Sequence, residues 1–220
     1  MAHESGDLAA LTEISEALAL ELDSAQLAQL SAYASLLFKW RSITNLTAAK
    51  NTLQFVREHV VDCLAVVPFV NARRLLDVGS GAGLPAIVLA IACPNLHVTA
   101  LEPRARRARF LTQSKIELGL DTVEVCCARV EAHKPSEPYD VVISRAFSSL
   151  EQFVLLTEDL HGPRTRIVAM KGAVNAVDLA AAEQLAGPGQ VVALDVPGFE
   201  HRNLVIFEPG RPRQGAAGQT

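Results

Sequence analysis

A glycine-rich segment near the middle of the 220-residue chain restricts its fold more than any other feature. Residues 75–83 read LLDVGSGAG, so an apolar strand passes through Asp77 and runs into glycines at positions 79, 81 and 83. Glycine permits a sharp turn and lets the backbone approach a ligand closely. Apolar residues then recur at helical spacing at Leu84, Ile87, Val88 and Ile91, with Pro85 in the first turn. A strand, a glycine-rich loop and a helix in this order are typical of doubly wound α/β domains, which bind small polar ligands at the helix N-terminus.

The spacing of the glycines separates two classes of nucleotide-binding domain. The dinucleotide fingerprint needs its third glycine three positions after the second, and Leu84 occupies that position here. Gly79, Gly81 and Gly83 instead resemble the D-x-G-x-G-x-G loop of class I S-adenosylmethionine-dependent methyltransferases. The loop therefore predicts a site for S-adenosylmethionine that includes Asp77 and the three glycines, and it counts against an NAD-dependent oxidoreductase.

Strand and helix patterns alternate along the chain from the strand before the glycine loop onward. The expected strands are residues 75–78, 97–101, 123–127, 141–143, 167–170, 191–196 and 204–207, with helices at 104–118, at 150–156 and ending near 187. The short gap between the last two strands favours an antiparallel pair. The sequence thus predicts an α/β fold of the class I methyltransferase type, Rossmann-like, with a mostly parallel seven-stranded sheet and an antiparallel terminal hairpin.

Helical patterns precede the loop. Asp23 and Gln26 form a capping box ahead of apolar residues at helical spacing up to Leu37, residues 45–47 (NLT) interrupt the pattern, and a further helix is expected over 53–67. We expect an N-terminal helical extension over residues 1–70, packed on a methyltransferase domain of residues 71–209. Residues 210–220 are rich in glycine and glutamine and are expected to be a disordered tail.

The charge and cysteine patterns bear on three questions: nucleic-acid binding, metal binding and cellular location. A formal net charge of −4 is not typical of a nucleic-acid binder, yet residues 1–38 contain no Lys or Arg, so the rest of the chain is slightly positive. The arginines at 104, 106, 107 and 109 lie near the expected cofactor site, and charge alone favours a solvated helix face over a phosphate-binding patch. The four cysteines lack metal-ligand spacing, so we expect reduced, mostly buried thiols, no metal, and a cytoplasmic protein without a membrane segment.

Polar residues at the ends of the expected strands predict the ligand site, because doubly wound sheets bind ligands outside the carboxyl ends of their strands. Glu102 ends the second strand, where a carboxylate can accept hydrogen bonds from ribose hydroxyls; the alternative is an acid at the N-terminus of the next helix, beside Arg104. Val130 and Glu131 follow the third strand, where adenine could lie, although an ordinary strand exit has the same pattern.

Two cations follow the next strands. Arg145 comes after the fourth strand and Lys171 after the fifth, which suggests a polyanion or a carbonyl-rich base as second substrate. The alternative is that they pair with carboxylates at positions 77, 131 or 140. His59 lies in the helix expected over 53–67, before the glycine loop. We interpret it as a core residue whose polar atoms are hydrogen-bonded.

Several further segments together resemble one family. They are Trp40 with residues 45–47 (NLT), 57–62 (REHVVD), 75–85 (LLDVGSGAGLP), 109–111 (RFL), 128–131 (ARVE), 143–147 (ISRAF) and 170–172 (MKG). Over roughly residues 33–207 the chain resembles the RsmG/GidB family of bacterial 16S rRNA guanine-N7 methyltransferases. The glycine loop alone indicates only the superfamily, whereas the NLT, GLP and SRAF segments together are specific.

The resemblance implies an activity and a set of site residues. The activity is transfer of a methyl group from S-adenosylmethionine to N7 of a guanine in a loop of 16S rRNA (guanine 527 in the usual family numbering), leaving S-adenosylhomocysteine. The family's cofactor contacts match Gly79, Leu84, Val130, Glu131 and Arg145. Its catalytic or RNA-linked positions match Asn45, Arg129 and Lys171, together with Arg145. Whether naked rRNA, the small ribosomal subunit or an assembly intermediate is the substrate stays open, and a small-molecule methyltransferase and a non-catalytic nucleotide-binding module remain as alternatives.

Overall fold

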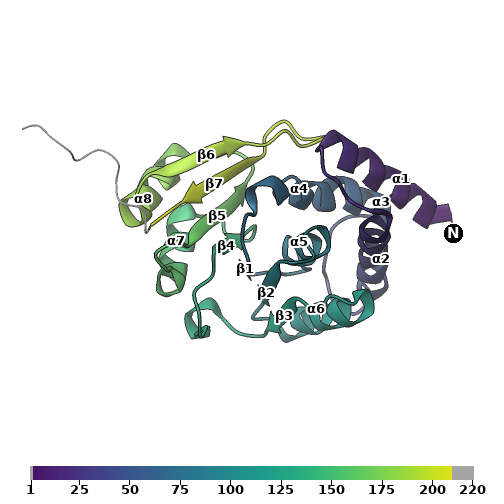
Figure 1. The fold of residues 1–220 in the computed structure, drawn as a ribbon, viewed down its shortest axis with the longest axis horizontal. Helices are drawn as coiled ribbons and strands as arrows, with labels where there is room; N and C mark the ends of the chain where they lie inside the picture. Colours follow the sequence, from purple (N-terminus) through teal and green to yellow (C-terminus); the bar gives the residue numbers. More distant parts are fainter. Residues whose placement is uncertain (1, 210–220) are drawn as a thin grey trace, which may run out of the picture.

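A computed structural model describes the backbone of residues 2–209 and the side chains of residues 5–209. Its centre is a seven-stranded sheet in the order β3-β2-β1-β4-β5-β7-β6 (Figure 1). The strands are β1 (Arg74–Val78), β2 (His97–Leu101), β3 (Val123–Cys126), β4 (Val141–Ser144), β5 (Arg166–Lys171), β6 (Gly189–Ala193) and β7 (Asn203–Phe207). The first five strands are parallel, and β7 runs antiparallel to both β5 and β6. The predicted fold class is confirmed, including its terminal hairpin.

The two faces of the sheet are covered by different helices. Helices α5 (Ala86–Ala92) and α6 (Ala105–Leu118) pack on one face together with the N-terminal helices, and α7 (Leu150–Thr157) and α8 (Ala176–Ala186) pack on the other (Figure 1). Successive side chains of a strand point to opposite faces, so Leu75 joins the first core and Leu76 joins the second. This arrangement is the doubly wound sheet that the alternation of strands and helices predicts.

The N-terminal helices contribute to the same core as α5 and α6. They are α1 (Ala2–Ala17), α2 (Ser24–Trp40), α3 (Thr52–Phe55) and α4 (Val61–Leu64). The predicted capping box of α2 is confirmed, because Asp23 accepts a hydrogen bond from the backbone N–H of Gln26 and the Gln26 side chain accepts one from the N–H of Asp23. The helix expected over 53–67 extends continuously only from Thr52 to Leu64, with a π-helical turn, η1 (Val56–Val60), between α3 and α4, and a 3₁₀ helix, η2 (Val67–Phe69), follows after a turn.

Three local differences separate the structure from the sequence prediction. The sequence pattern does not predict α1 as a helix of its own. The sixth strand begins at Gly189 and ends at Ala193 instead of spanning 191–196, and a side chain at 189 would place its Cβ 2.7 Å from Cε1 of Phe207. Pro85 is the N-cap of α5 and not a residue of its first turn.

Two other expectations have mixed outcomes. All four cysteines are free thiols, but only Cys63 is buried and Cys127 is exposed, so the expectation that most are buried is wrong. The helices described between residues 2 and 209 are all too short or too polar to cross a membrane. The division into an extension and a methyltransferase domain at residue 70 stays a prediction, and the tail of 210–220 lies outside the described residues.

Candidate functional site

The candidate site lies where the connections after β1 and β4 diverge. These strands are parallel neighbours, and the chain leaves β1 toward α5 on one face and β4 toward α7 on the other. Such a switch point is where open α/β sheets bind ligands. The hydroxyl of Ser144, at the end of β4, donates to the carbonyl oxygen of Val78 at the end of β1, with 2.7 Å between the two oxygens. The two strand ends are thus held together beneath the loops that form the site.

The glycine loop has a shape that requires glycine. The angle φ is +79° at Gly79, +57° at Gly81 and +95° at Gly83, a region that other residues rarely adopt. A side chain at Gly83 would place its Cβ 2.5 Å from Cγ1 of Ile87. The hydroxyl of Tyr33, on α2, donates to the carbonyl oxygen of Ala82 at 2.6 Å. The loop therefore turns tightly and is held in place from the N-terminal helices.

Asp77 holds the helix that follows the loop. The residue is fully buried, and its Oδ2 accepts a hydrogen bond from the backbone N–H of Ala86 at 3.2 Å. Pro85, the N-cap of α5, supplies no side-chain cap, so Asp77 satisfies one of the free N–H groups of this helix. Its other oxygen, Oδ1, has no hydrogen-bond partner among the described residues. Burial raises the pKa of the Asp77 carboxyl to about 7.

Glu102 joins the glycine loop to α6. One carboxylate oxygen accepts a hydrogen bond from the N–H of Gly81 and the other accepts one from the N–H of Arg104, each at 2.9 Å. Arg104 is the N-cap of α6, so the interpretation of Glu102 as an acid at a helix N-terminus is confirmed. Each carboxylate oxygen can accept a second hydrogen bond, so the ribose role stays a prediction that this geometry permits.

Arg145 is held by side chains from one helical segment. Its Nε lies 3.4 Å from Oδ2 of Asp62, and one terminal nitrogen donates to Nδ1 of His59 at 3.0 Å. The other terminal nitrogen lies 3.8 Å from Sγ of Cys63. Burial, followed by the charge of Arg145, lowers the pKa of His59 and favours its neutral ring. The carboxylate that pairs with Arg145 is thus Asp62, and the alternative of a pair at position 77, 131 or 140 is wrong.

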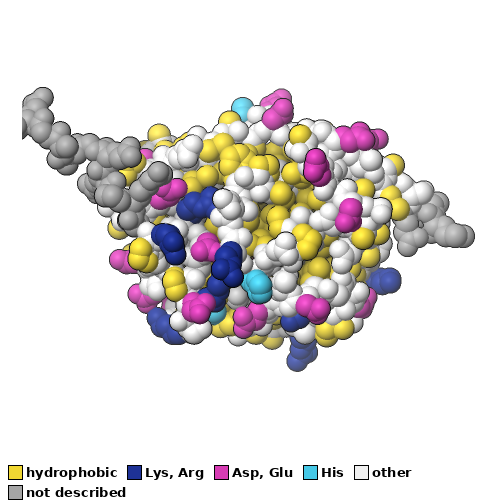
Figure 2. Space-filling model, viewed as in Figure 1, with side chains coloured by type: hydrophobic (Ala, Val, Ile, Leu, Met, Phe, Trp, Pro, Cys, Tyr) yellow, Lys and Arg dark blue, Asp and Glu magenta, His cyan; other side chains and the backbone are white. Residues whose placement is uncertain are grey.

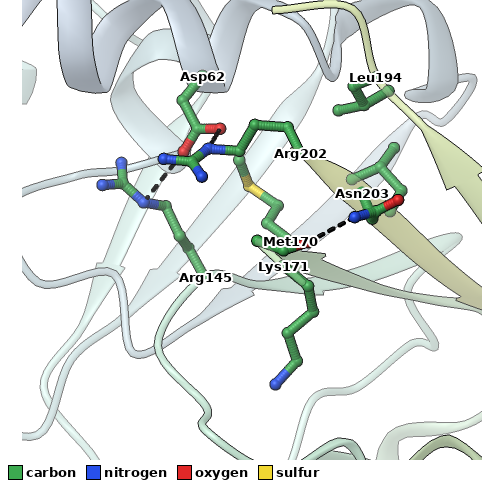
Figure 3. Close-up of a pocket in the computed structure, with 9 residues that line it drawn as sticks. Asp62, Arg145, Met170, Lys171, Leu194, Arg202 and Asn203 are labelled. Carbon is green, nitrogen blue, oxygen red and sulfur yellow. Dashed lines mark hydrogen bonds and ion pairs between the residues drawn. The ribbon is translucent and has the colours of Figure 1, made fainter. Parts of the chain in front are cut away.

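Lys171 contacts backbone and not a carboxylate. Its Nζ donates to the carbonyl oxygens of Phe147 and Ser148, at 2.9 and 2.7 Å, and so ties the end of β5 to the loop between β4 and α7. Burial lowers the pKa of this ammonium. A pocket of about 200 Å³ is lined by Arg145, Lys171 and Arg202, among others, and the ammonium of Lys171 points away from Asp62 (Figure 3).

The other predicted site residues lie outside this set of contacts. Arg129 is the N-cap of a short 3₁₀ helix, η3 (Val130–Ala132), and is exposed, as is Glu131. Val130 packs against the core on the α7 side, and Asn45 is exposed in the segment after α2. Within residues 5–209, no side-chain hydrogen bond or ion pair connects Asn45, Arg129 or Glu131 with Arg145 or Glu102.

The arginines of α6 are divided between solvent and the loop. Arg106 and Arg109 are exposed, as the solvated-face interpretation predicts, whereas Arg107 is half-buried with a terminal nitrogen 3.8 Å from where a Cβ on Gly81 would lie.

The surface charge near the candidate site is mixed. On the side of the molecule that Figure 2 shows, Lys and Arg side chains are interspersed with Asp and Glu side chains where β4 and α7 lie in Figure 1. This region of the surface is therefore not uniformly positive.

Sequence reasoning missed two residues of the site and underrated a third. Asp62 bridges Arg145 and Arg202, with 3.0 Å between its Oδ1 and Nε of Arg202, and the interpretation of His59 as a core residue leaves out its contact with Arg145. Asp62 gave one usable signal, because it is a charged residue among the apolar side chains of the 53–67 helix. Arg202 gave none, since it lies in the short connection between β6 and β7, far along the chain from the glycine loop.

The fold and the loop geometry define the class I methyltransferase fold, and comparison with solved structures agrees. An O-methyltransferase from Bacillus cereus in complex with SAH superposes with a TM-score of 0.58 at 16% identity, covering 90% of this chain and 96% of that one. TomG, an O-methyltransferase from Streptomyces achromogenes in complex with SAM, gives a TM-score of 0.56 at 17% identity, covering 94% of this chain and 99% of that one. At these identities the likeness shows the fold alone.

Sequence comparison identifies the family. The model of the GidB family, described as rRNA small subunit methyltransferase G, matches residues 26–205. The chain is 43% identical over 191 residues to Ribosomal RNA small subunit methyltransferase G of Pseudomonas syringae pv. tomato, covering 86% of this chain and 90% of the relative. It is 42% identical over 194 residues to the protein of that name from Methylobacillus flagellatus, covering 88% and 94%. The chain belongs to the rRNA small subunit methyltransferase G family, which excludes the oxidoreductase alternative.

Proposed function

We propose that this protein transfers the methyl group of S-adenosylmethionine to N7 of a guanine in a loop of 16S rRNA, guanine 527 in the usual family numbering. The observation that carries the rRNA substrate is the match of the family model to residues 26–205. The choice of N7 and of this guanine rests on the resemblance of the NLT and SRAF segments to the family. The proposed substrate also places the protein in the cytoplasm.

The groups at the switch point suit S-adenosylmethionine, which carries two cationic centres, a carboxylate, a ribose and an adenine. Oδ1 of Asp77, buried without a partner among the described residues, suits a cation or an N–H donor. The second lone pairs of Glu102 suit the ribose hydroxyls, and the Arg145 guanidinium suits the carboxylate. A Cβ on Gly79 would lie 3.1 Å from Cβ of Ala146, so the loops after β1 and β4 approach each other closely across the site. Leu84, Val130 and Glu131 complete the proposed cofactor contacts.

Methyl transfer to N7 requires few catalytic side chains. S-adenosylmethionine, when bound, supplies an electrophilic methyl group on a sulfonium. Guanine N7 has an in-plane lone pair and no proton, so no residue of the site has to act as a general base. His59 fits this, because its Nδ1 already accepts a hydrogen bond from Arg145. Holding the reacting atoms in line accounts for up to about 7–11 kcal/mol of such a barrier, and this alignment is the task we assign to Arg145, Lys171, Arg129 and Asn45.

The target base must be accessible. In an A-form helix N7 lies in a deep, narrow major groove that side chains cannot enter, so the guanine is expected in a loop or turned out of the stack. An Arg or Lys can contact guanine O6 or the flanking phosphates, whereas a donor on N7 itself would block the reaction. RNA contacts to phosphates predict that transfer at limiting RNA falls steeply as salt concentration rises.

The test is to map 7-methylguanine in rRNA from cells with and without this protein, and then to repeat the reaction in vitro. We expect one 7-methylguanine in 16S rRNA to depend on the protein. In vitro, 7-deazaguanine at the target should abolish transfer, because it lacks the nucleophilic nitrogen. Methylation that persists at the 7-deaza base would show another acceptor atom, and unchanged rRNA in the deletion strain would favour the small-molecule alternative. Parallel reactions on naked 16S rRNA and on small subunits decide which form is the substrate.

A further inference from the structure

The guanidinium of Arg145 is oriented almost entirely by the helix that begins at Thr52. Each of its three nitrogens meets a different side chain of this helix, namely Asp62, His59 and Cys63. A guanidinium has five N–H donors, so these contacts leave one N–H on each terminal nitrogen for a ligand. Burial raises the pKa of the Cys63 thiol to about 12 and lowers that of His59, so both partners are neutral near pH 7. Among these three partners, Asp62 alone carries a charge opposite to that of Arg145.

Asp62 serves two arginines at once. Its Oδ2 pairs with Nε of Arg145 at 3.4 Å, and its Oδ1 pairs with Nε of Arg202 at 3.0 Å (Figure 3). The Asp62 side chain is 7% exposed, and the guanidinium of Arg202 lies 4.0 Å above the ring centroid of Phe199. One buried carboxylate thus fixes side chains that arrive from the end of β4 and from the β6–β7 connection. With Lys171, three cationic side chains and one carboxylate line the pocket, which leaves an excess of positive charge there.

The π-helical turn η1 lies directly before this contact. His59 belongs to the turn, and Asp62 and Cys63 follow it at helical spacings of three and four, so all three side chains lie on one face of the helix. Val56 and Val60 of the turn are fully buried on the core side. π turns are rare and occur frequently at functional sites. The turn thus lies where the helix meets Arg145 with its polar face.

We propose that Asp62 and His59 are positioning residues, which hold the Arg145 guanidinium in the orientation that meets the cofactor and the target base. The proposal rests on the proposed function, in which Arg145 takes part in methyl transfer. Asp62 holds the guanidinium through an ion pair at Nε, and His59 accepts a hydrogen bond from a terminal nitrogen. Neither residue has to touch the substrate, so both act through Arg145.

A double-mutant cycle tests this action through Arg145. Asp62→Asn should lower kcat by about 10–100-fold, the effect of a small misplacement, with little change in KM for the RNA substrate. In an Arg145→Ala background the same substitution should change kcat by less than about twofold, because the group it positions is gone. Fold losses that multiply in the double variant, or a wild-type kcat in Asp62→Asn, would overturn the proposal.

A matched control separates positioning from stability. Oδ2 of Asp140 accepts hydrogen bonds from the backbone N–H groups of Arg73 and Arg74, at 2.8 and 2.9 Å, at the opposite edge of the sheet. Asp140→Asn removes the same charge and should lower the melting temperature while kcat per folded molecule stays at the wild-type value. If Asp140→Asn lowers kcat as much as Asp62→Asn does, the Asp62 effect is a stability effect and the proposal is wrong.

Histidine variants provide an independent measurement should Asp62→Asn fold poorly. His59→Asn keeps an acceptor near the position of Nδ1 and should retain most of the activity, whereas His59→Ala should lose several-fold in kcat; equal activities would refute the role of His59. The same variants are titrated with S-adenosylmethionine by calorimetry, where Asp62→Asn should weaken binding in the wild-type background and not in Arg145→Ala. If the wild type methylates no small-subunit rRNA, the proposed function fails, and the cycle in cofactor affinity still decides the role of Asp62.

Discussion

At the residue scale, the carboxylates of the site differ in what they already bind. Both oxygens of Glu102 accept backbone N–H groups, whereas Asp77 keeps one buried oxygen without a partner among the described residues. The position of both residues at strand ends could be predicted from the sequence, because an acid before the glycine loop and another at the end of the next strand are local patterns. Their hydrogen bonds could not, because the contacts of Asp77 with Ala86 and of Glu102 with Gly81 depend on how the loop folds back.

The raised pKa of the Asp77 carboxyl leads us to expect that a proton is released when the cofactor binds. With a pKa of about 7, the carboxyl is about half protonated at pH 7. A cation bound beside Oδ1 favours the ionised form, so binding at this pH should release up to roughly half a proton. Calorimetric titration with S-adenosylmethionine in buffers of different ionisation enthalpy measures this release. Asp77→Asn lacks the titrating carboxyl and should not show this release. Buffer-independent enthalpies for the wild type at pH 7 would contradict the prediction.

At the element scale, the strands were predicted better than the turns within helices. The hydrophobic runs placed every strand of the parallel region to within one or two residues, and the short spacing before residue 204 gave the antiparallel hairpin. The π turn at Val56–Val60 could not be predicted from the local sequence, because Val56 and Val60 join a core built from segments remote in sequence while His59 meets Arg145. The contact between Asp62 and Arg202 could not be predicted either, because it joins segments that are remote in sequence.

The glycine loop gives a prediction at this scale with an internal control. Gly119, the C-cap of α6, has φ of +64° and open space where a Cβ would lie, whereas Gly83 has φ of +95° and a Cβ there would meet Cγ1 of Ile87 at only 2.5 Å. Gly119→Ala should lower the free energy of unfolding by about 1–2 kcal/mol, the backbone cost alone. Gly83→Ala adds an overpacking cost of about 1–3 kcal/mol and should lower it by about 2–5 kcal/mol in total. Urea unfolding measures both, and equal losses would show that the loop relaxes around the methyl group.

At the scale of the whole molecule, both faces of the sheet are covered and the site lies at one edge between them. The N-terminal helices share a core with α5 and α6 and also supply Tyr33 to the loop and Asp62 to Arg145. The sequence predicted their packing on the sheet but not these two contacts with the site. The N-terminal helices therefore contact both the core on one face and the candidate site, while α7 and α8 form the core on the other face.

A histidine that contacts α7 should make the stability of the molecule depend on pH. His161 follows α7, its Nε2 lies 2.9 Å from the hydroxyl oxygen of Thr157, and burial lowers its pKa from 6.5 to about 4. The Thr157 hydroxyl can donate to the carbonyl oxygen of Phe153 at 2.8 Å, so we assign the His161 proton to Nε2.

The sign of the effect follows from proton binding. Between pH 6.5 and 4 the unfolded chain holds the His161 proton and the folded protein does not, so acidification through this window lowers the free energy of unfolding. Above pH 6.5 the histidine contributes no pH dependence, and partial exposure of the ring reduces the effect below its full value. Urea unfolding at a series of pH values, with wild type and His161→Gln side by side, measures it. The glutamine amide can still donate to Thr157 and does not titrate, so the variant should lose less stability than the wild type on acidification. His97→Gln, at an exposed position at the start of β2, should follow the wild type, and parallel curves for wild type and His161→Gln would refute the assignment.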